Sequence, residues 1–386
     1  MLKQPVADLA RNAPKNSLFI RIFNPKHLAF PLTIGLCMLL LLYESDAVIS
    51  YMNQGLLLCA KTVIPSLFPF MVLAEFMVCS GCGELLGKLC ERPMRRIFGI
   101  SGAGACAFIM GALCGFPIGT KTAVSLHQRG EISTEELSRL ICFCNIPSSA
   151  FLINAVGISL FENRRFGIFL YLICLFSAFI TAYVLRRSPS FAPMEPHQNI
   201  VTPPSGISVF THAVTSAATA ILYVCAYVIF FSALVGTLGE FLFSLGAGPT
   251  AIAALFGLFE LSGGVAHISS LPDPILSHWL TALFCGWSGL SVHLQILSLC
   301  GDIPIRAHRY FLCKLLQGVL CAFLCGVFLY FAPNSWFIPE TNVSQTAIQT
   351  IIHPHLLTTI NLSLLFAWLI ALIYQGMKMI KSCRKQ

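Results

Sequence analysis

Long apolar runs alternate with short polar or basic segments along most of the chain, between residues 28 and 377. Several runs reach about twenty residues, the length that a helix needs to cross the hydrocarbon core of a bilayer. They lack the weak alternation of polar and apolar positions that is typical of membrane β-barrels. The pattern predicts an all-α, polytopic helical membrane protein with about 8–10 spans.

The apolar runs and their breaks predict where these spans lie. Residues 83–99 carry too many charges to cross a bilayer and are expected to form an amphipathic helix on its surface. Two prolines, Pro65 and Pro69, should kink the second span. Up to ten crossings are expected, at 28–43, 56–78, 100–128, 134–162, 166–185, 213–235, 240–262, 275–300, 310–332 and 356–377.

Charge and proline content divide the chain into five parts. The linker at 188–207 holds five prolines and few apolar residues. Basic flanks place both termini in the cytoplasm under the positive-inside rule. The parts are a basic N-terminus with a signal anchor (1–45), a first repeat with its following span (46–187), the linker (188–207), a second repeat with its following span (208–332), and an extramembrane loop, C-terminal span and basic tail (333–386).

The segment 111–151 is apolar at both ends, but residues that break helices interrupt it twice. The first break contains Gly115, Pro117 and Gly119, and the second contains Asn145 and Pro147. A membrane core has no water for free backbone groups, so broken helices occur there only inside protein or beside a polar cavity. The segment therefore predicts a solute-binding site.

The two halves resemble each other around these breaks. The segment 111–119 matches 253–264, with Gly115 near Gly257, and the triplet at 143–145 matches the triplet at 284–286. Interrupted segments at corresponding positions of two halves are a pointer to a transporter binding site. The repeats would be parallel if every segment crosses the membrane, and inverted if one segment is a re-entrant hairpin. Chance similarity of two Gly- and Phe-rich segments is the alternative.

Two charged residues lie close to the breaks. Lys121 follows the first break and is a candidate for binding an anion, or a lysine that reaches the membrane surface from a helix end. Glu260 lies among apolar residues, where a carboxylate needs a pairing cation or a proton. The two occupy comparable places in the two halves, so they could also pair with each other.

Short polar side chains gather at the later break of each half. Such groups, with exposed carbonyls, could coordinate a polar solute, although hydrogen bonding between helices is the common alternative. The set comprises Asn145, Ser148 and Ser149 in the first half, and Ser288, Ser291, His293 and Gln295 in the second half. Ser288, Ser291 and Gln295 have the spacing of one helical face.

Composition narrows the range of functions that the protein can have. The 386 residues are 56% hydrophobic and 10% charged, and the formal charge of +8 comes from short flanks of apolar runs. This placement suits lipid headgroups and membrane orientation, so nucleic acid is not expected as a partner. Most of the 17 cysteines lie within apolar runs as small hydrophobic residues. We find no metal, cofactor or hydrolase motif, and expect that the protein is not an enzyme.

Four motifs resemble the sporulation integral membrane proteins of the YlbJ type, which belong to the wider Gate, or nucleoside-recognition, group. They are GFPIGTK (115–121), EISTEELSRLICFCN (131–145), LFELSGG (258–264) and GWSGLSVHLQ (286–295). The resemblance implies a role in spore maturation in the plasma membrane or forespore membrane of an endospore-forming bacterium, with movement of dipicolinate. The chain departs from the family pattern at Phe116, Ile146 and Pro147, which makes substrate contacts there less transferable.

These observations support three hypotheses. The first is a transporter of a small organic anion, which the resemblance suggests is dipicolinate, with Lys121 and helix N-termini meeting its carboxylates and Glu260 taking up a coupling proton or cation. The second is a nucleoside transporter. The third is a non-transporting membrane protein of spore-envelope assembly. The sequence leaves the oligomeric state open.

Overall fold

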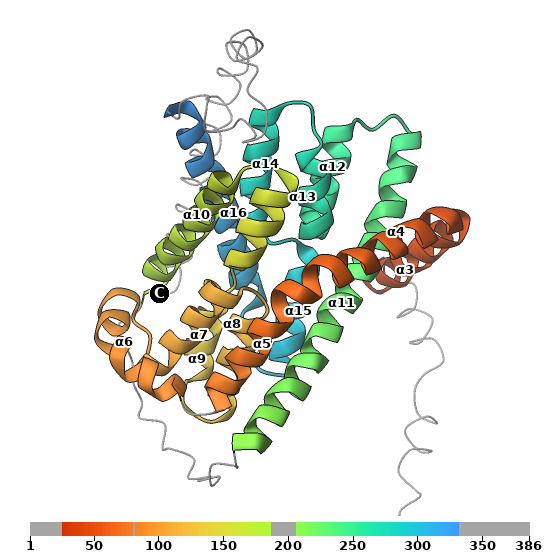
Figure 1. Ribbon diagram of the computed structural model, residues 1–386. Coiled ribbons are helices and arrows are strands. Elements are labelled where there is room, and N and C mark those ends of the chain that lie inside the picture. Colours follow the sequence, from red (N-terminus) through yellow and green to blue (C-terminus); the bar gives the residue numbers. More distant parts are fainter. Residues whose placement is uncertain (1–24, 80–81, 187–205, 332–386) are drawn as a thin grey trace, which may run out of the picture.

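The computed structural model describes residues 25–79, 82–186 and 206–331 (Figure 1). The predicted all-α class is confirmed, because these ranges form fourteen α-helices and two π-helices. Within them, four helices are long and apolar enough to cross a membrane, or up to six if two bent pairs count as spans. The chain is therefore a polytopic helical membrane protein. The predicted span at 356–377 and most of the predicted linker lie outside the described residues.

The N-terminal helices contain one sharp bend and one π-helical turn. Helices α3 (Pro25–Tyr43) and α4 (Ser45–Leu58) meet at a sharp angle, and the π-helix η1 (Cys59–Val63) continues into α5 (Ile64–Cys79). The π-helical turn ends two residues before Pro65, whose ring crowds the carbonyl four residues earlier and whose missing N–H cannot bond to it. The wider turn accommodates this proline, and helix α5 continues through Pro69. The sequence predicted a kink at these two prolines.

The first repeat consists of a hairpin followed by a broken helix. After the amphipathic α6 (Cys82–Phe98), helices α7 (Gly102–Cys114) and α8 (Ile118–Gln128) pack against each other as a hairpin. Helix α9 (Thr134–Leu140) ends in turns and irregular backbone at 141–148, and helical residues 149–150 lead into the π-helix η2 (Phe151–Leu160) and the uninterrupted α10 (Arg164–Val184). Ser133 caps α9 by accepting a hydrogen bond from the Glu136 amide at 3.2 Å. These elements match the predicted breaks, but the prediction of a crossing at 100–128 was wrong, because α7 and α8 fold back on each other at the first break.

The second repeat has the same order of elements. Helix α11 (Gly206–Ser244) leads into a hairpin of α12 (Pro249–Phe259) and α13 (Leu261–Ser269), then α14 (Pro274–Trp287), a short break, α15 (Leu290–Cys300) and α16 (Ala307–Phe331). The prediction of separate spans at 213–235 and 240–262 was wrong. Helix α11 runs unbroken for 39 residues, or about 58 Å, because the glycines within it do not stop an otherwise apolar helix.

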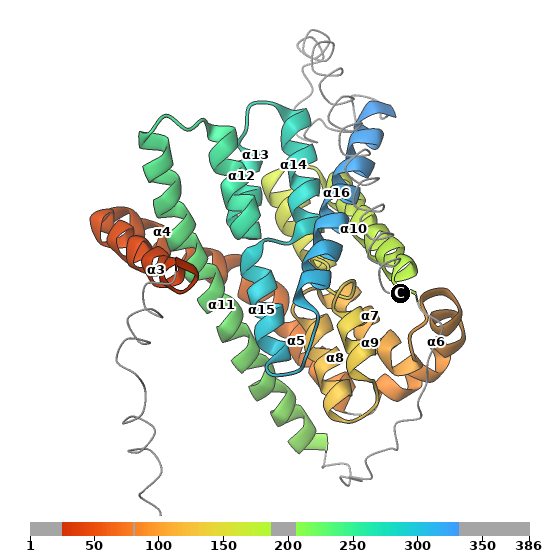
Figure 2. The ribbon, with the colours of Figure 1, turned by 180° about the vertical axis from the view of Figure 1, so that it is seen from behind.

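The two hairpins approach the middle of the molecule from opposite ends. Figure 1 shows α7 and α8 in the lower half, and α12 and α13 in the upper half. Figure 2 shows the same separation from behind, with α15 below α14. Each hairpin is too short to cross the molecule, so each re-enters from one side. This arrangement is typical of inverted repeats and disfavours the parallel alternative.

Two long helices join the repeats. Helix α11 packs along α4, α5, α12 and α15, while α16 packs on α14 of its own repeat and on α10 of the first. Between them lie the two hairpin tips and the two helix breaks. The fold thus collects all four interruptions near its centre.

Candidate functional site

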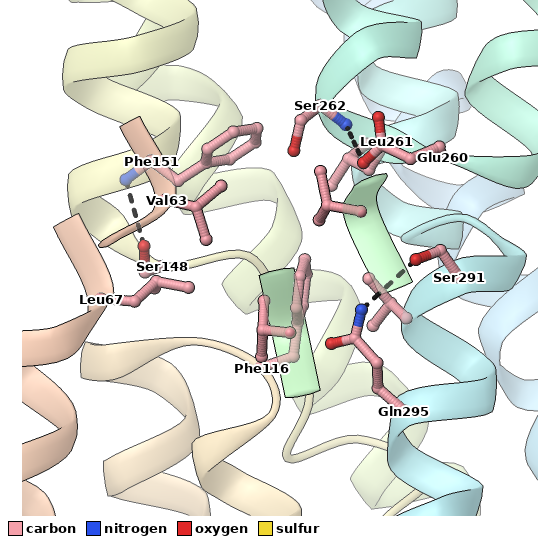
Figure 3. A pocket seen from close by; sticks show the side chains of 13 residues that line it. Val63, Leu67, Phe116, Ser148, Phe151, Glu260, Leu261, Ser262, Ser291 and Gln295 are labelled. Atoms are coloured by element: carbon pink, nitrogen blue, oxygen red, sulfur yellow. Dashed lines mark hydrogen bonds between the residues drawn. The ribbon is translucent and has the colours of Figure 1, made fainter. Parts of the chain in front are cut away.

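A pocket lies where the interruptions of the two repeats meet (Figure 3). It encloses about 500 Å³, including its open mouth. In Figure 3, Ser148 and Phe151 lie on one side, Glu260, Ser291 and Gln295 on the other, and Phe116 between them. The walls are mostly apolar, and a few polar side chains come from the breaks, as is common in small-molecule sites. The lining residues are Val63, Leu67, Phe116, Ser148, Phe151, Val224, Val228, Glu260, Leu261, Ser262, Ser291, Val292 and Gln295.

The tip of the first hairpin packs directly onto the first break. Gly115 has a φ of +81°, and a Cβ there would lie 2.5 Å from the Ser148 amide nitrogen, so only glycine suits this position. The next residue, Phe116, donates its amide to the Ile146 carbonyl at 3.0 Å. This contact holds the Phe116 ring at the pocket wall. Gly115 and Pro117 therefore shape the tip and do not themselves line the pocket.

The first break, residues 141–150, is clamped between the arms of that hairpin. The Cys144 carbonyl oxygen lies between Gly111 on α7 and Gly119 on α8, so close that a Cβ at either glycine would overlap it. Any larger residue would push the hairpin away from the break. The predicted site residue Gly119 thus serves this close approach.

Asn145 joins the break to the hairpin and has all of its side-chain groups engaged. Its Oδ1 accepts hydrogen bonds from the Thr120 amide (3.2 Å) and the Thr120 hydroxyl (2.9 Å). Its Nδ2 donates to the Ile141 carbonyl at 3.0 Å. The side chain is completely buried. Asn145 therefore caps the start of α8 from another segment, and it does not line the pocket.

Two side chains of α16 bond to free carbonyls of the same break. The fully buried Lys314 donates from Nζ to the Asn145 carbonyl at 2.7 Å and to Gln317 Oε1 at 2.9 Å. Gln317 Nε2 in turn donates to the Cys142 carbonyl at 2.8 Å. Backbone carbonyls without helical partners are thereby satisfied inside the protein.

The serines after the break differ in position. Ser148 lines the pocket and accepts a hydrogen bond from the Phe151 amide at 3.1 Å, which caps the start of η2. Ser149 points to the Leu113 carbonyl at 3.4 Å in an exposed position. Only the first of the two belongs to the pocket.

The tip of the second hairpin consists of one residue, Glu260, which separates α12 from α13. Its carboxylate accepts hydrogen bonds from the Ser262 amide (2.9 Å) and the Gly263 amide (2.5 Å). The side chain is 3% exposed and borders the pocket. A carboxylate at a helix N-terminus is stabilised by the free amides and the helix dipole. Glu260 is therefore a cap that also faces the pocket.

The second break is a tight turn at Ser288 and Gly289. Both have positive φ values, 80° and 79°, a conformation that glycine adopts readily and serine does not. The turn is braced by Trp287, which donates from Nε1 to the Leu258 carbonyl of the hairpin at 2.9 Å. Helix α15 begins directly after the turn, and among the described residues no side chain caps it.

Polar atoms at this break lack partners among the described residues. Ser288 Oγ, His293 Nε2 and Gln295 Oε1 are buried and make no hydrogen bond. Gln295 borders the pocket and donates from Nε2 to Ser291 Oγ at 3.3 Å. A hydroxyl both donates and accepts, so rotation of the Gln295 amide would present either an acceptor or a donor to the pocket. Buried polar atoms without partners point to a missing ligand or water.

His293 lies behind the pocket wall. Its Nδ1 bonds to the Tyr310 hydroxyl at 2.7 Å, and its ring packs edge-on against Trp287. Ser288 likewise does not line the pocket. The predicted shared face of Ser288, Ser291 and Gln295 is therefore reduced to its last two members, because the left-handed turn at Ser288 rotates that residue away from the α15 face.

Lys121 pairs with a residue that the sequence did not suggest. Its Nζ lies 3.0 Å from Glu75 Oε2 on α5 and donates to Ser216 Oγ on α11 at 2.8 Å. The possible pairing of Lys121 with Glu260 was wrong, because Lys121 on α8 faces α5 and α11, whereas Glu260 forms the tip of the second hairpin. Lys121 is also outside the pocket. It bridges the first hairpin to two scaffold helices.

One group near this ion pair has metal-ligand chemistry. Glu75, Cys79 and His212 place one ligand atom each within 4.8 Å of one another. The Lys121 ammonium already neutralises the Glu75 carboxylate, and a metal cation there would have to displace it. The group fits an ion-pair network better than a metal centre.

Four of the twelve predicted site residues therefore line the pocket, namely Ser148, Glu260, Ser291 and Gln295. The other eight hold the tips and breaks in place or lie beside them. Sequence inspection missed Lys314 and Glu75, although each is a lone charge within an apolar run and thus carried the same signal as Glu260. It also missed the aromatic walls, Phe116 and Phe151.

Comparison with known proteins agrees with this architecture. Residues 60–190, from η1 to just past the end of α10, match the Gate family, described as nucleoside recognition. The match covers less than half of the chain. Over 333 residues it is 28% identical to the sporulation integral membrane protein YlbJ of Bacillus subtilis (strain 168), covering 76% of this chain and 80% of that protein. The resemblance found in the sequence motifs is confirmed. No solved structure matches the chain.

Proposed function

We propose that this protein is a membrane transporter of a small organic anion, dipicolinate, and that it acts in sporulation like the relative whose name refers to that process. The pocket between the two repeats would hold the substrate. Paired interrupted helices that meet at one place are the arrangement that secondary transporters use for their binding sites.

The observation that carries this proposal is the uncapped start of α15 at the pocket. Three of the four helix starts at the interruptions already have a polar side chain: Asn145 at α8, Ser148 at η2 and Glu260 at α13. The N-terminus of α15 has none among the described residues. Free amides and the helix dipole there favour a carboxylate. The Ser291 hydroxyl and the Gln295 amide are next to it and can add hydrogen bonds.

The apolar wall fits the rest of such a substrate. Phe116 and Phe151 come from the first repeat, and Val224 and Val228 come from α11. A planar aromatic ring would pack against the two phenylalanine rings, which favour offset or edge-on contacts. A small aromatic dicarboxylate combines this ring with the charge that α15 would meet.

Glu260 would supply the coupling to protons. A dicarboxylate entering the pocket brings negative charge close to the Glu260 carboxylate, and like charges in a low-dielectric site repel. Proton uptake by Glu260 would remove this repulsion. Substrate binding and protonation would then favour each other.

Uptake into vesicles tests the proposal. Purified protein in proteoliposomes should accumulate labelled dipicolinate, and Ser291→Ala or Gln295→Ala should reduce the uptake. Ser149→Ala is the matched control, because its hydroxyl is exposed and outside the pocket. The proposal fails if folded wild-type protein neither binds nor moves dipicolinate.

A nucleoside is the second candidate, favoured by the description of the Gate family and by the acceptors at the pocket. The free Gln295 Oε1 and the Glu260 carboxylate would accept hydrogen bonds from ribose hydroxyls. Competition separates the candidates. Uridine or adenosine would displace the substrate in this case, whereas dipicolinate would have no effect.

A further inference from the structure

Lys314 is a fully buried lysine that has no carboxylate partner in the part of the chain that the structure describes. Its exposed fraction is 0%, and among the described residues the salt bridges involve other side chains only. It lies in the first third of α16, two turns after the helix begins, and this helix is apolar enough to cross a membrane. Charged residues at such positions are rare, and they pair with one another or with backbone carbonyls.

The partners of Lys314 are the oxygen atoms that a metal cation would use. The ammonium contacts the Asn145 carbonyl at 2.7 Å and the Gln317 amide oxygen at 2.9 Å. Carbonyl and amide oxygens are the ligands that hard cations prefer. The first of these oxygens belongs to unwound backbone within the membrane protein, which is where transporters coordinate coupling cations.

We propose that Lys314 is a tethered cation, which permanently fills the cation site of the first break. Its ammonium replaces a dissociable metal ion as the charge that holds the carbonyls of 141–150 in place. The first break then needs no bound sodium or potassium ion to keep its shape. Lys314 is thus a positioning residue, because it touches the break and does not line the substrate pocket.

The geometry around Gln317 extends this role to the second repeat. Gln317 accepts from Lys314 and donates to the Cys142 carbonyl at 2.8 Å. On its other side, a Cβ at Gly286 of α14 would lie 2.7 Å from the Gln317 carbonyl oxygen. Gly286 is two residues before the second break. The tethered charge therefore holds the first break against the helix segment that leads into the second.

Backbone hydrogen exchange tests this proposal without reference to any substrate. In Lys314→Ala, exchange of the amides of 141–150 should rise at least about tenfold, and ethylammonium, which restores the missing charge and part of the volume, should reverse the rise. Sodium should reverse it partly, whereas the bulky N-methylglucamine cation should not. Lys61→Ala, at an exposed lysine, is the matched control and should exchange like the wild type.

Two further measurements keep the proposal falsifiable if Lys314→Ala does not fold. Lys314→Met keeps the volume and removes the charge, and it overturns the proposal if 141–150 exchanges as in the wild type. The wild type itself should show the same exchange in sodium and in N-methylglucamine. A wild type that needs sodium or potassium to protect 141–150 also overturns the proposal.

The uptake measurement alone rests on the proposed transport function. Wild-type uptake should not change when potassium or N-methylglucamine replaces sodium, whereas Lys314→Ala should transport only with a small monovalent cation. Loss of transport in every protein, with the exchange pattern as expected, would reject the transport function and leave the tethered cation standing.

Discussion

The first break, at 141–150, and the second, at Ser288 and Gly289, stand at equivalent places in the two repeats, but their polar groups are bonded differently. In the first break, the Cys142, Asn145 and Ile146 carbonyls accept hydrogen bonds from other parts of the protein, and the Ile141 carbonyl accepts one from the Asn145 side chain. In the second, three buried side-chain atoms have no partner among the described residues, and α15 starts without a cap.

This difference separates the part of the site that keeps its shape, the first break, from the part that binds the ligand, the second break. Unsatisfied buried polar groups are costly, and a protein that keeps them at one place gains when a ligand supplies the missing partners. The first break already has its hydrogen-bond partners within the protein and should matter for folding. The second is incomplete and should matter for binding.

The largest effect is expected from Gly111→Ala. The added methyl group would overlap the Cys144 carbonyl and push the hairpin off the first break, which should lower the free energy of unfolding by about 3 kcal/mol or more. Thermal unfolding in detergent measures this change. Gly239→Ala is the control, because a Cβ there would approach only side-chain atoms at 3.3 Å and beyond. Equal stability of the two variants would contradict the clamp.

Asn145→Ala should also act through folding. It removes three hydrogen bonds and leaves the Ile141 carbonyl and the start of α8 without partners, at a cost of about 2–3 kcal/mol. The same unfolding measurement applies. A variant of normal stability with strongly weakened substrate binding would mean that Asn145 is a ligand contact. This result would contradict the assignment of the first break to folding and the second to binding.

Glu260→Gln should change the response of uptake to pH. Wild-type uptake of an anion should fall as the pH rises, because a deprotonated Glu260 repels it, and the neutral amide should remove most of this dependence. At alkaline pH the variant should transport faster, on the order of tenfold. Initial rates across a pH series measure the effect. Parallel pH profiles for the two proteins would exclude Glu260 as the coupling group.

Gln295→Ala should weaken substrate binding and change stability little, because Oε1 has no partner among the described residues and the one hydrogen bond that is lost, from Nε2 to Ser291 Oγ, is long at 3.3 Å. Loss of one neutral hydrogen bond of about 1 kcal/mol should raise KM about fivefold. Uptake kinetics and unfolding are measured on the same preparation. A large loss of stability with a normal KM would mean that Gln295 supports the fold and does not bind the substrate.

Lys121→Met should have the smallest effect. The lysine pairs with Glu75 at 3.0 Å in a partly exposed position, so its loss should cost at most about 1 kcal/mol of stability. KM should stay within about twofold of the wild type, since half a kcal/mol separates such values. A tenfold rise in KM would mean that Lys121 contributes to substrate binding.

The sequence predicted the helix interruptions well, but it predicted the contacts of the charged side chains poorly. Glycine and proline change the backbone at their own positions, so breaks could be recognised from Gly115, Pro117 and Gly289. Glu260 stood out as a buried charge, but its role as the cap of α13 depends on where α12 ends. The partner of Lys121 is 46 residues away in sequence, and no local pattern points to Glu75. Contacts between distant helices are fixed by packing, which a single sequence does not show.

The bonds from α16 to the first break also set an order for assembly. Lys314 follows its partner Asn145 by 169 residues, and Gln317 follows Cys142 by 175. While the chain is being inserted into the membrane, the break must persist through the synthesis of nearly the whole second repeat before these donors arrive. Until then its carbonyls need water or a chaperone. A ribosome stalled before residue 314 should therefore hold a first repeat that has entered the membrane but has not matured.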